Sequence, residues 1–178
     1  FENALRISYS RTRYGTGYYI FHLYANDTRL SQNNGTFDIN RAPEKEVLDL
    51  IGKAGLDIAP TGIEKINGTL KLDSERVTIA EINATAPRQV RALKLTIPLD
   101  KAIDMERIRL VATWDGAKHP SIDAPLCLFF GAGTFYNRDN QEFLVKGLPM
   151  NIRFDFVNNK VELSCYYPMP FFKSAKFE

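Results

Sequence analysis

The chain has 178 residues, of which 44% are hydrophobic and 25% are charged. This composition predicts a folded globular protein with a substantial core and excludes the low-hydrophobicity signature of a disordered chain. The 23 Lys and Arg residues nearly balance the 21 Asp and Glu residues, and a formal net charge of +2 gives no strong field for a polyanion, so we do not expect nucleic acid as a partner.

The first 40 residues are predicted to hold the closing strands of a β-sandwich. Residues 17–24 are apolar on both faces, which is typical of a central strand, and we expect them to be deeply buried. His22 within this run is interpreted as a core histidine. The N-terminus lacks the regions of a signal peptide, and no stretch reaches the roughly 18 apolar residues of a membrane span. Because the chain begins inside a strand-like run, we expect a fragment or a processed piece.

A short helix is predicted after Pro43. Proline near the start, acidic residues in the first turn and Gly55 just past the end are typical helix boundaries. Val47, Leu48 and Ile51 would form its apolar side. We interpret this helix as a linker, and we divide the chain into closing strands over residues 1–40, a helical linker over 41–62 and a jelly-roll sandwich over 63–178.

Period-2 alternation dominates the remainder of the chain and predicts an all-β, jelly-roll-like antiparallel β-sandwich with one short linker helix. The pair Asn158-Asn159 predicts a tight two-residue hairpin turn, because Asn tolerates a positive φ. The apolar positions of the alternating runs are Leu93, Leu95, Ile97 and Leu99; Ile108, Leu110, Ala112 and Trp114; Ile152, Phe154 and Phe156; and Val161, Leu163, Cys165 and Tyr167.

The two cysteines, Cys127 and Cys165, each lie in an apolar strand-like run. Free cysteine behaves as a small hydrophobic residue, so we expect two buried thiols. A single disulfide between two strands is the alternative. A metal site is not indicated, because the chain has no CxxC motif and no close Cys/His spacing, and we expect no metal or other cofactor.

The richest stretch for chemistry runs from Trp114 to Gly133. Asp115-Gly116 marks a turn, whereas Asp123 lies between two strand-like runs and is the better candidate for a polar role. Aromatic rings beside carboxylates are typical of sugar sites, because rings stack on the apolar faces of sugars while acids bind hydroxyls, although such rings more often belong to the core. The candidates for substrate binding or an interface are Asp123, Phe129, Phe130, Tyr136 and Arg138.

Two groups of motifs carry a resemblance to a known family. The first is Trp-Asp-Gly, Pro-Ser, Ala-Pro-Leu and Phe-Phe-Gly over residues 114–131, and the second is Cys-Tyr-Tyr-Pro-Met-Pro-Phe followed by Lys-Ser-Ala over 165–175. With them the chain resembles glycoside hydrolase family 172. Prolines 168 and 170 within the second group are expected to bend the chain or to hold it extended at a sheet edge.

This resemblance implies tandem jelly rolls, assembly into a homo-oligomer such as a trimer, and hydrolysis or transfer at α-linked furanosides such as D-arabinofuranosides and fructofuranosides. The family's catalytic pair is two glutamates, on a Trp-Gly-Glu-type and a Gly-Thr-Glu segment. Neither segment occurs here, so we expect the catalytic residues beyond Glu178. Many members also have Asp directly before Phe-Phe-Gly, where this chain has Leu128.

We therefore expect a part of a carbohydrate-active protein, a furanoside hydrolase in a secreted or periplasmic location, that lacks the catalytic glutamates itself. Its partners would be a glycan and further copies of the chain. The alternative is a non-catalytic module, either a carbohydrate-binding β-sandwich or an assembly domain.

Overall fold

The computed structural model of the chain describes residues 6, 20, 24, 25, 27–29, 31, 38, 40–73 and 75–178. Contacts between Cα atoms divide the chain into two compact units, Phe1–Glu44 and Lys45–Glu178. The predicted central strand over 17–24 lies outside the described residues, apart from Ile20 and Tyr24, which are exposed. The boundaries that we placed at residues 40 and 62 stay a prediction.

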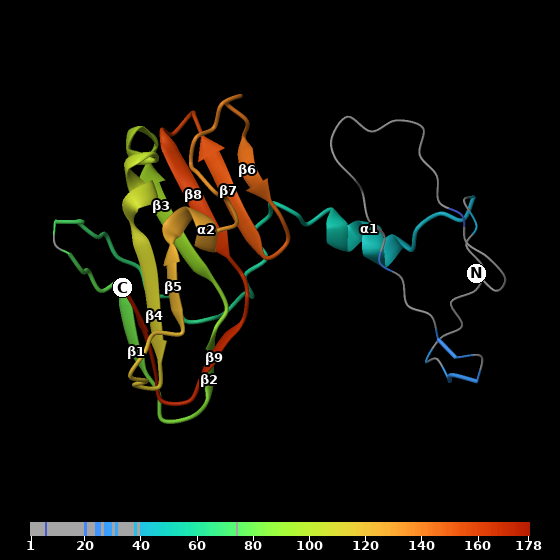
Figure 1. Ribbon diagram of the computed structural model, residues 1–178, viewed down its shortest axis with the longest axis horizontal. Coiled ribbons are helices and arrows are strands. Elements are labelled where there is room, and N and C mark those ends of the chain that lie inside the picture. The colour runs from blue at the N-terminus through green and yellow to red at the C-terminus, as the bar shows by residue number, and fades with distance from the viewer. Residues whose placement is uncertain are drawn as a thin grey trace. The chain divides into compact units, whose positions relative to one another are not determined.

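The predicted short helix is present as α1 (Lys45–Ile51) (Figure 1). The apolar side predicted for this helix is not buried, because α1 has no buried residue and Val47, Leu48 and Ile51 are all at least half exposed. A second short helix, α2 (Leu126–Phe129), replaces the strand that we expected around Cys127. Two 3-10 turns, η1 (Leu99–Lys101) and η2 (Asp104–Arg107), follow strand β3 (Leu93–Pro98).

The second unit is built from antiparallel sheets, which confirms the predicted all-β sandwich. In the described part of the chain, two four-stranded sheets have the orders β1-β10-β4-β5 and β3-β8-β7-β6, and a short ribbon pairs β2 with β9. The strands are β1 (Ala80–Asn83), β2 (Arg88–Val90), β3 (Leu93–Pro98), β4 (Arg109–Trp114), β5 (Ile122–Pro125), β6 (Phe143–Lys146), β7 (Met150–Asp155), β8 (Lys160–Cys165), β9 (Met169–Phe171) and β10 (Ser174–Phe177).

One long antiparallel ribbon connects the two sheets. Strands β1, β2 and β3 pair in turn with β10, β9 and β8, so residues 80–98 run against residues 160–177. Pro170 lies in β9 opposite Gln89. Because proline has no N–H to donate, it fits this two-stranded ribbon better than the middle of a sheet. We predicted that the prolines would either bend the chain or hold it extended. Pro170 shows the second effect, because it lies in the extended strand β9.

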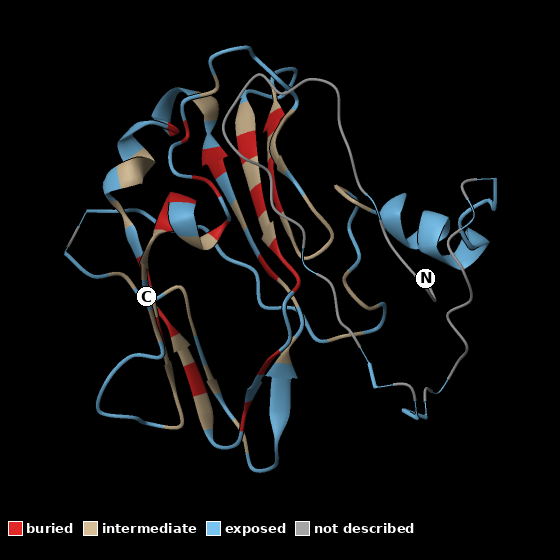
Figure 2. Cartoon of the chain, turned by 45° about the vertical axis from the view of Figure 1, so that its right-hand side comes forward, coloured by how far each residue is buried: buried red, intermediate tan, exposed pale blue. Residues whose placement is uncertain are grey.

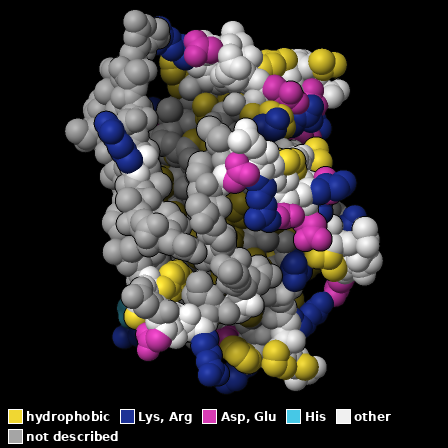
Figure 3. Space-filling view, turned by 90° about the vertical axis from the view of Figure 1, so that its right-hand side faces the viewer, with side chains coloured by type: hydrophobic (Ala, Val, Ile, Leu, Met, Phe, Trp, Pro, Cys, Tyr) yellow, Lys and Arg dark blue, Asp and Glu magenta, His cyan; other side chains and the backbone are white. Residues whose placement is uncertain are grey.

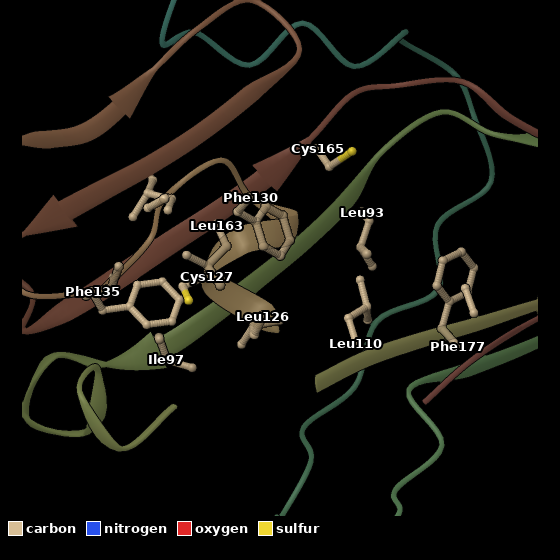
Figure 4. Packing of buried hydrophobic residues seen from close by; sticks show 14 of the residues in the cluster. Leu93, Ile97, Leu110, Leu126, Cys127, Phe130, Phe135, Leu163, Cys165 and Phe177 are labelled. Atoms are coloured by element: carbon tan, nitrogen blue, oxygen red, sulfur yellow. The ribbon is translucent and has the colours of Figure 1, made fainter. Parts of the chain in front are cut away.

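The core joins residues of both sheets with α2. The alternating apolar residues of β3, β4, β7 and β8 are buried or half-buried, as predicted, and Figure 2 shows the buried residues along these strands and on α2. Phe130 and Phe135, from the chain around and after α2, are almost completely inaccessible and belong to the same cluster (Figure 4). Cys127 and Cys165 are buried and free, so the disulfide alternative is wrong.

The hairpin between β7 and β8 is confirmed, but its turn is longer than predicted. Asp155 pairs with Lys160, which leaves residues 156–159 as a four-residue connection, and only Asn159 among them has a positive φ, of 50°. The carboxylate of Asp155 accepts hydrogen bonds from the backbone N–H and the side-chain amide of Asn158, at 3.0 and 2.7 Å. Phe156 therefore lies in the turn and is exposed, contrary to the predicted inward position. Tyr167, also predicted to face inward, lies beyond the end of β8 and is 52% exposed.

Candidate functional site

The face of the β3-β8-β7-β6 sheet that points away from the core carries polar side chains in cross-strand rows. Strand register places Lys94, Ser164, Asn151 and Lys146 in one row and Thr96, Glu162, Arg153 and Phe143 in the next. Because successive residues of a strand point to opposite faces, the same strands supply the core with their other residues. We call this polar surface the outer face.

A β-bulge at Leu144 brings two residues of β6 onto the outer face. Phe143 pairs with Arg153 and Val145 pairs with Ile152, so the register shifts by one residue between them. Residues three apart in a regular strand would point to opposite faces, but the extra residue places Phe143 and Lys146 on the same one. The ammonium group of Lys146 lies 5.1 Å from the centre of the Phe143 ring.

Arg153 links two carboxylates across the outer face. Its Nε donates to Glu142 Oε1 at 2.8 Å, and its Nη1 donates to Glu162 Oε2 at 3.3 Å. Hydrogen bonding to Glu142 raises the pKa of Arg153, and hydrogen bonding to Glu162 raises the pKa of Lys160, which lies 2.6 Å from that carboxylate. Acidic and basic side chains also lie next to each other on the described part of the surface in Figure 3.

Residues 52–57, directly after α1, cover the first row of the outer face. The N–H of Gly55 donates to the carbonyl of Gly147 at 3.0 Å, and Gly55 has a φ of 84°. A Cβ at this position would lie 3.1 Å from side-chain atoms of both Lys146 and Phe143, so the close approach requires glycine. The covering segment and the sheet enclose a groove of about 560 Å³.

At the other side of the groove, Asp57 forms an ion pair with Lys94. The hydrogen bond from Lys94 lowers the pKa of Asp57. The Lys94 ammonium also lies 5.7 Å from the ring centre of Tyr166, and burial raises the pKa of the Tyr166 hydroxyl. These contacts tie the covering segment to β3 and to the end of β8.

Asn151 is the buried polar side chain of the groove. It is 4% exposed, and its Oδ1 accepts a hydrogen bond from the Gly147 N–H at 3.0 Å. Its Nδ2 has no hydrogen-bond partner among the described residues. A buried amide group without a partner is costly, so Nδ2 of Asn151 is the unsatisfied donor of the groove.

The residues that the sequence singled out do not lie in this groove. Asp123 is on β5, where its Oδ1 accepts a hydrogen bond from Arg109 Nε at 2.7 Å, and both side chains are about half exposed. Phe130 is 0% exposed and is a core residue, so its ring has no free surface for a sugar. Phe129 is half-buried and packs edge-on against Phe130, with ring centres 5.0 Å apart.

Tyr136 is displayed on a braced loop. Its ring is 63% exposed, while the adjacent Phe135 is buried. Thr134 Oγ1 accepts a hydrogen bond from the Tyr136 N–H at 2.9 Å and donates to Glu106, which also accepts the N–H of Phe135 at 2.7 Å. The hydrogen bond from Thr134 lowers the pKa of Glu106. Tyr136 is therefore an exposed residue on a loop whose backbone is held by these hydrogen bonds.

Arg138 is exposed on the same loop, two residues further on. All five candidates belong to the described part of the chain. Among these five candidates, the rings of Phe129 and Phe130 are in contact with each other. No hydrogen bond or ion pair joins Asp123, Tyr136 and Arg138.

Asp115 has the turn position that the sequence predicted, together with a structural role. Asp115 and Gly116 have φ values of 55° and 68°. Asp115 Oδ1 accepts three backbone N–H groups, from Phe172 at 2.9 Å, Lys173 at 2.6 Å and Ser174 at 3.1 Å. The bond from Lys173 makes the largest contribution to lowering the Asp115 pKa. The Trp-Asp-Gly motif thus fixes the turn that precedes β10.

Sequence analysis missed the groove, although it identified the strands on which the groove is built. The polar positions of β3, β7 and β8 were visible in the alternation, but no role was predicted for them. Among the residues that the structure describes, no group of three or more His, Cys, Asp or Glu side chains could hold a metal ion. In the same residues no helix is long and apolar enough to cross a membrane.

The comparisons with known proteins support one assignment. Residues 67–178, more than half of the chain, match the family described as GH172 domain-like. No curated protein and no solved structure matches the chain. The matched region begins before β1 and includes the Trp-Asp-Gly turn, α2 and both four-stranded sheets. The chain belongs to the GH172 family, a carbohydrate-active family related to glycoside hydrolases.

Proposed function

We propose that the chain is part of a hydrolase acting on α-linked furanosides, D-arabinofuranosides or fructofuranosides, and that it supports the active site without supplying the catalytic pair. The family match over residues 67–178 carries this proposal. The motif resemblance at residues 114–131 and 165–175 supports the choice of furanosides over other glycosides.

The carboxylates of the described residues support a non-catalytic role. A retaining glycosidase needs one carboxyl that stays protonated, with a raised pKa, about 5–5.5 Å from a second, ionised one. Where a described carboxyl shows a shift, its pKa is lowered, as for Asp57, Glu106, Asp115 and Asp155. Each is held in the ionised form by hydrogen bonds that also fix a loop, a turn or the covering segment.

The test compares the natural protein that contains this chain with residues 1–178 alone. We expect the whole protein to release the aryl group from aryl α-D-arabinofuranosides or aryl fructofuranosides, and the isolated chain to release none. Hydrolysis by the isolated chain would place the catalytic pair within it. Inactivity of the folded whole protein on both substrates would reject the furanoside proposal.

A non-catalytic glycan-binding module is the second candidate, and the exposure of Tyr136 favours it. An exposed ring on a loop whose backbone is held by hydrogen bonds is suited to stacking on a sugar face. A glycan array probed with the chain and with Tyr136→Ala tests this function, with Phe172→Ala as a matched control because Phe172 is also exposed, at 65%. Binding that Tyr136→Ala removes and Phe172→Ala retains favours the module. A stable homo-oligomer without glycan binding favours an assembly domain.

A further inference from the structure

We propose that the groove beneath residues 52–57 binds one neutral sugar residue, and that Nδ2 of Asn151 donates a hydrogen bond to one of its hydroxyl groups. The inference rests on the proposed carbohydrate function only for the choice of ligand class. The groove lies on the outer face of the β3-β8-β7-β6 sheet, and its lining does not include Asp123 or Tyr136.

The first argument is the unpartnered amide of Asn151. The side chain is 4% exposed and lines the groove. Oδ1 accepts the N–H of Gly147, which it shares with the Met150 carbonyl, and this leaves Nδ2 as the group without a partner. Buried donors in native proteins almost always have a partner, so a hydroxyl oxygen above Asn151 would complete the site.

The second argument is the size and the fixed walls of the groove. Its volume of about 560 Å³ falls within the range of small-ligand sites, roughly 300–1,000 Å³. The wall formed by residues 52–57 is held at Gly55 by its hydrogen bond to Gly147 and at Asp57 by its ion pair with Lys94. A site with both walls held in place loses little entropy when it binds.

The third argument is the balance of charge and of hydrogen-bonding groups. Lys94, Lys146 and Arg153 line the groove together with the three carboxylates of Asp57, Glu142 and Glu162. Lys94 and Arg153 already pair with those carboxylates, so the groove offers donors and acceptors without a net charge. Hydroxyl groups both donate and accept, which fits a neutral sugar better than an anion.

Two aromatic rings supply apolar surface in the same groove. Phe143 and Tyr166 both contribute to its lining. Sugar rings have apolar C–H faces as well as hydroxyl edges, so a wall with aromatic carbon beside a row of polar groups matches both. The bulge at Leu144 is what places Phe143 there.

The experiment follows the Asn151 side-chain amide by NMR in the ¹⁵N-labelled chain. Its signals are identified by their loss in Asn151→Asp, a change that keeps an oxygen for Gly147 but replaces the Nδ2 donor with an acceptor oxygen and adds a negative charge. D-arabinose, D-fructose and D-galactose are titrated into the wild-type chain, with D-galacturonate and phosphate as anionic probes. We expect the Asn151 amide to shift with at least one neutral sugar and not with phosphate.

The matched control is Asn140→Asp, the same chemical change in an exposed loop outside the groove. We expect Asn151→Asp to weaken binding of the neutral sugar about 10-fold or more, the cost of one buried hydrogen bond, and Asn140→Asp to leave it unchanged. No shift with any neutral sugar, equal binding by the two variants, or tighter binding of galacturonate than of galactose would each overturn the inference.

Failure of this inference is distinguishable from failure of the proposed function. If the whole protein hydrolyses aryl furanosides but the Asn151 amide responds to no sugar, the groove proposal is wrong and the proposed hydrolase function stands. If the amide responds to a sugar but the whole protein is inactive, the groove proposal stands and the hydrolase proposal is wrong.

Discussion

The two faces of the β3-β8-β7-β6 sheet use the same strands for different purposes. In β8, Val161, Leu163 and Cys165 are at most 1% exposed and pack in the core, whereas Glu162 and Ser164 between them face the groove. On the core face, apolar contact with both sheets holds the fold together. On the outer face, ion pairs and one covering segment form the groove. The alternation of a single strand thus separates the core from the groove that we propose as a binding site.

The largest effect is expected on the core face. Leu163→Ala removes a side chain that is 0% exposed, so it should lower the free energy of unfolding by about 2–5 kcal/mol through lost burial and the remaining cavity. Urea unfolding followed by fluorescence measures it. Glu162→Ala, the next residue on the other face, is the control and should cost about 1 kcal/mol or less. Equal effects would contradict the division between the two faces.

The second effect concerns the segment that covers the outer face. Gly55→Ala should lower stability by about 1–2 kcal/mol through its left-handed φ and should also detach the segment, because the new Cβ meets Lys146 and Phe143. Gly62→Ala is a close control, since Gly62 has a φ of 73° but no atom within 4 Å of its Cβ position. Thermal unfolding and amide exchange at Gly55 compare the two. Equal exchange at Gly55 in both variants would show that the close contact is unimportant.

A smaller effect is expected from the charge network. Arg153→Met leaves Glu142 and Glu162 without their shared cation, but these side chains are partly exposed to solvent, so the loss should be about 0.5–1 kcal/mol and should shrink at high salt. Lys101→Met, which removes the long ion pairs to Asp100 and Asp104, is the control and should have no measurable effect. A loss above about 2 kcal/mol would mean that the network is structural.

The smallest effect is the pH dependence of the Asp57–Lys94 pair. Because Lys94 lowers the pKa of Asp57 below its ordinary value of 3.8, the folded state favours the ionised carboxyl. Its contribution is therefore complete above pH 3.8 and disappears as the pH falls through the lower folded-state pKa. Since Asp57 is 61% exposed, we expect a few tenths of a kcal/mol. Urea unfolding of Asp57→Asn should differ from wild type at neutral pH and coincide with it in strong acid. A difference that grows in acid would contradict this sign.

Much of the sandwich could be predicted from the sequence, because a half-buried sheet selects alternating residues. The runs at Leu93, Leu110, Ile152 and Leu163 became β3, β4, β7 and β8 for this reason. The run at Leu126–Phe129 did not become a strand, since four consecutive apolar residues fit a buried helix turn equally well and periodicity cannot separate the two.

The groove could not be predicted, because it depends on contacts between distant residues. Gly55 was interpreted as the residue just past the end of a helix. Nothing in the sequence showed that its N–H would donate a hydrogen bond to the carbonyl of Gly147. The bulge at Leu144 reverses the side of the sheet on which Phe143 lies, and alternation counted through β6 places Phe143 on the wrong face. Tyr136 and Asp123 were visible as residue types, but their surroundings became known only from the fold.

The place of β10 has a consequence for how the domain folds during synthesis. This strand comes from the last residues of the matched region, yet it lies between β1 and β4 in its sheet. The β1-β10-β4-β5 sheet therefore cannot close until residues 174–177 have left the ribosome, and its pairing joins segments far apart in the sequence. Such long-range pairing slows folding. Until β10 is made, the edges of β1 and β4 that it pairs with have unsatisfied backbone groups. Chains interrupted before Ser174 should therefore be prone to aggregation.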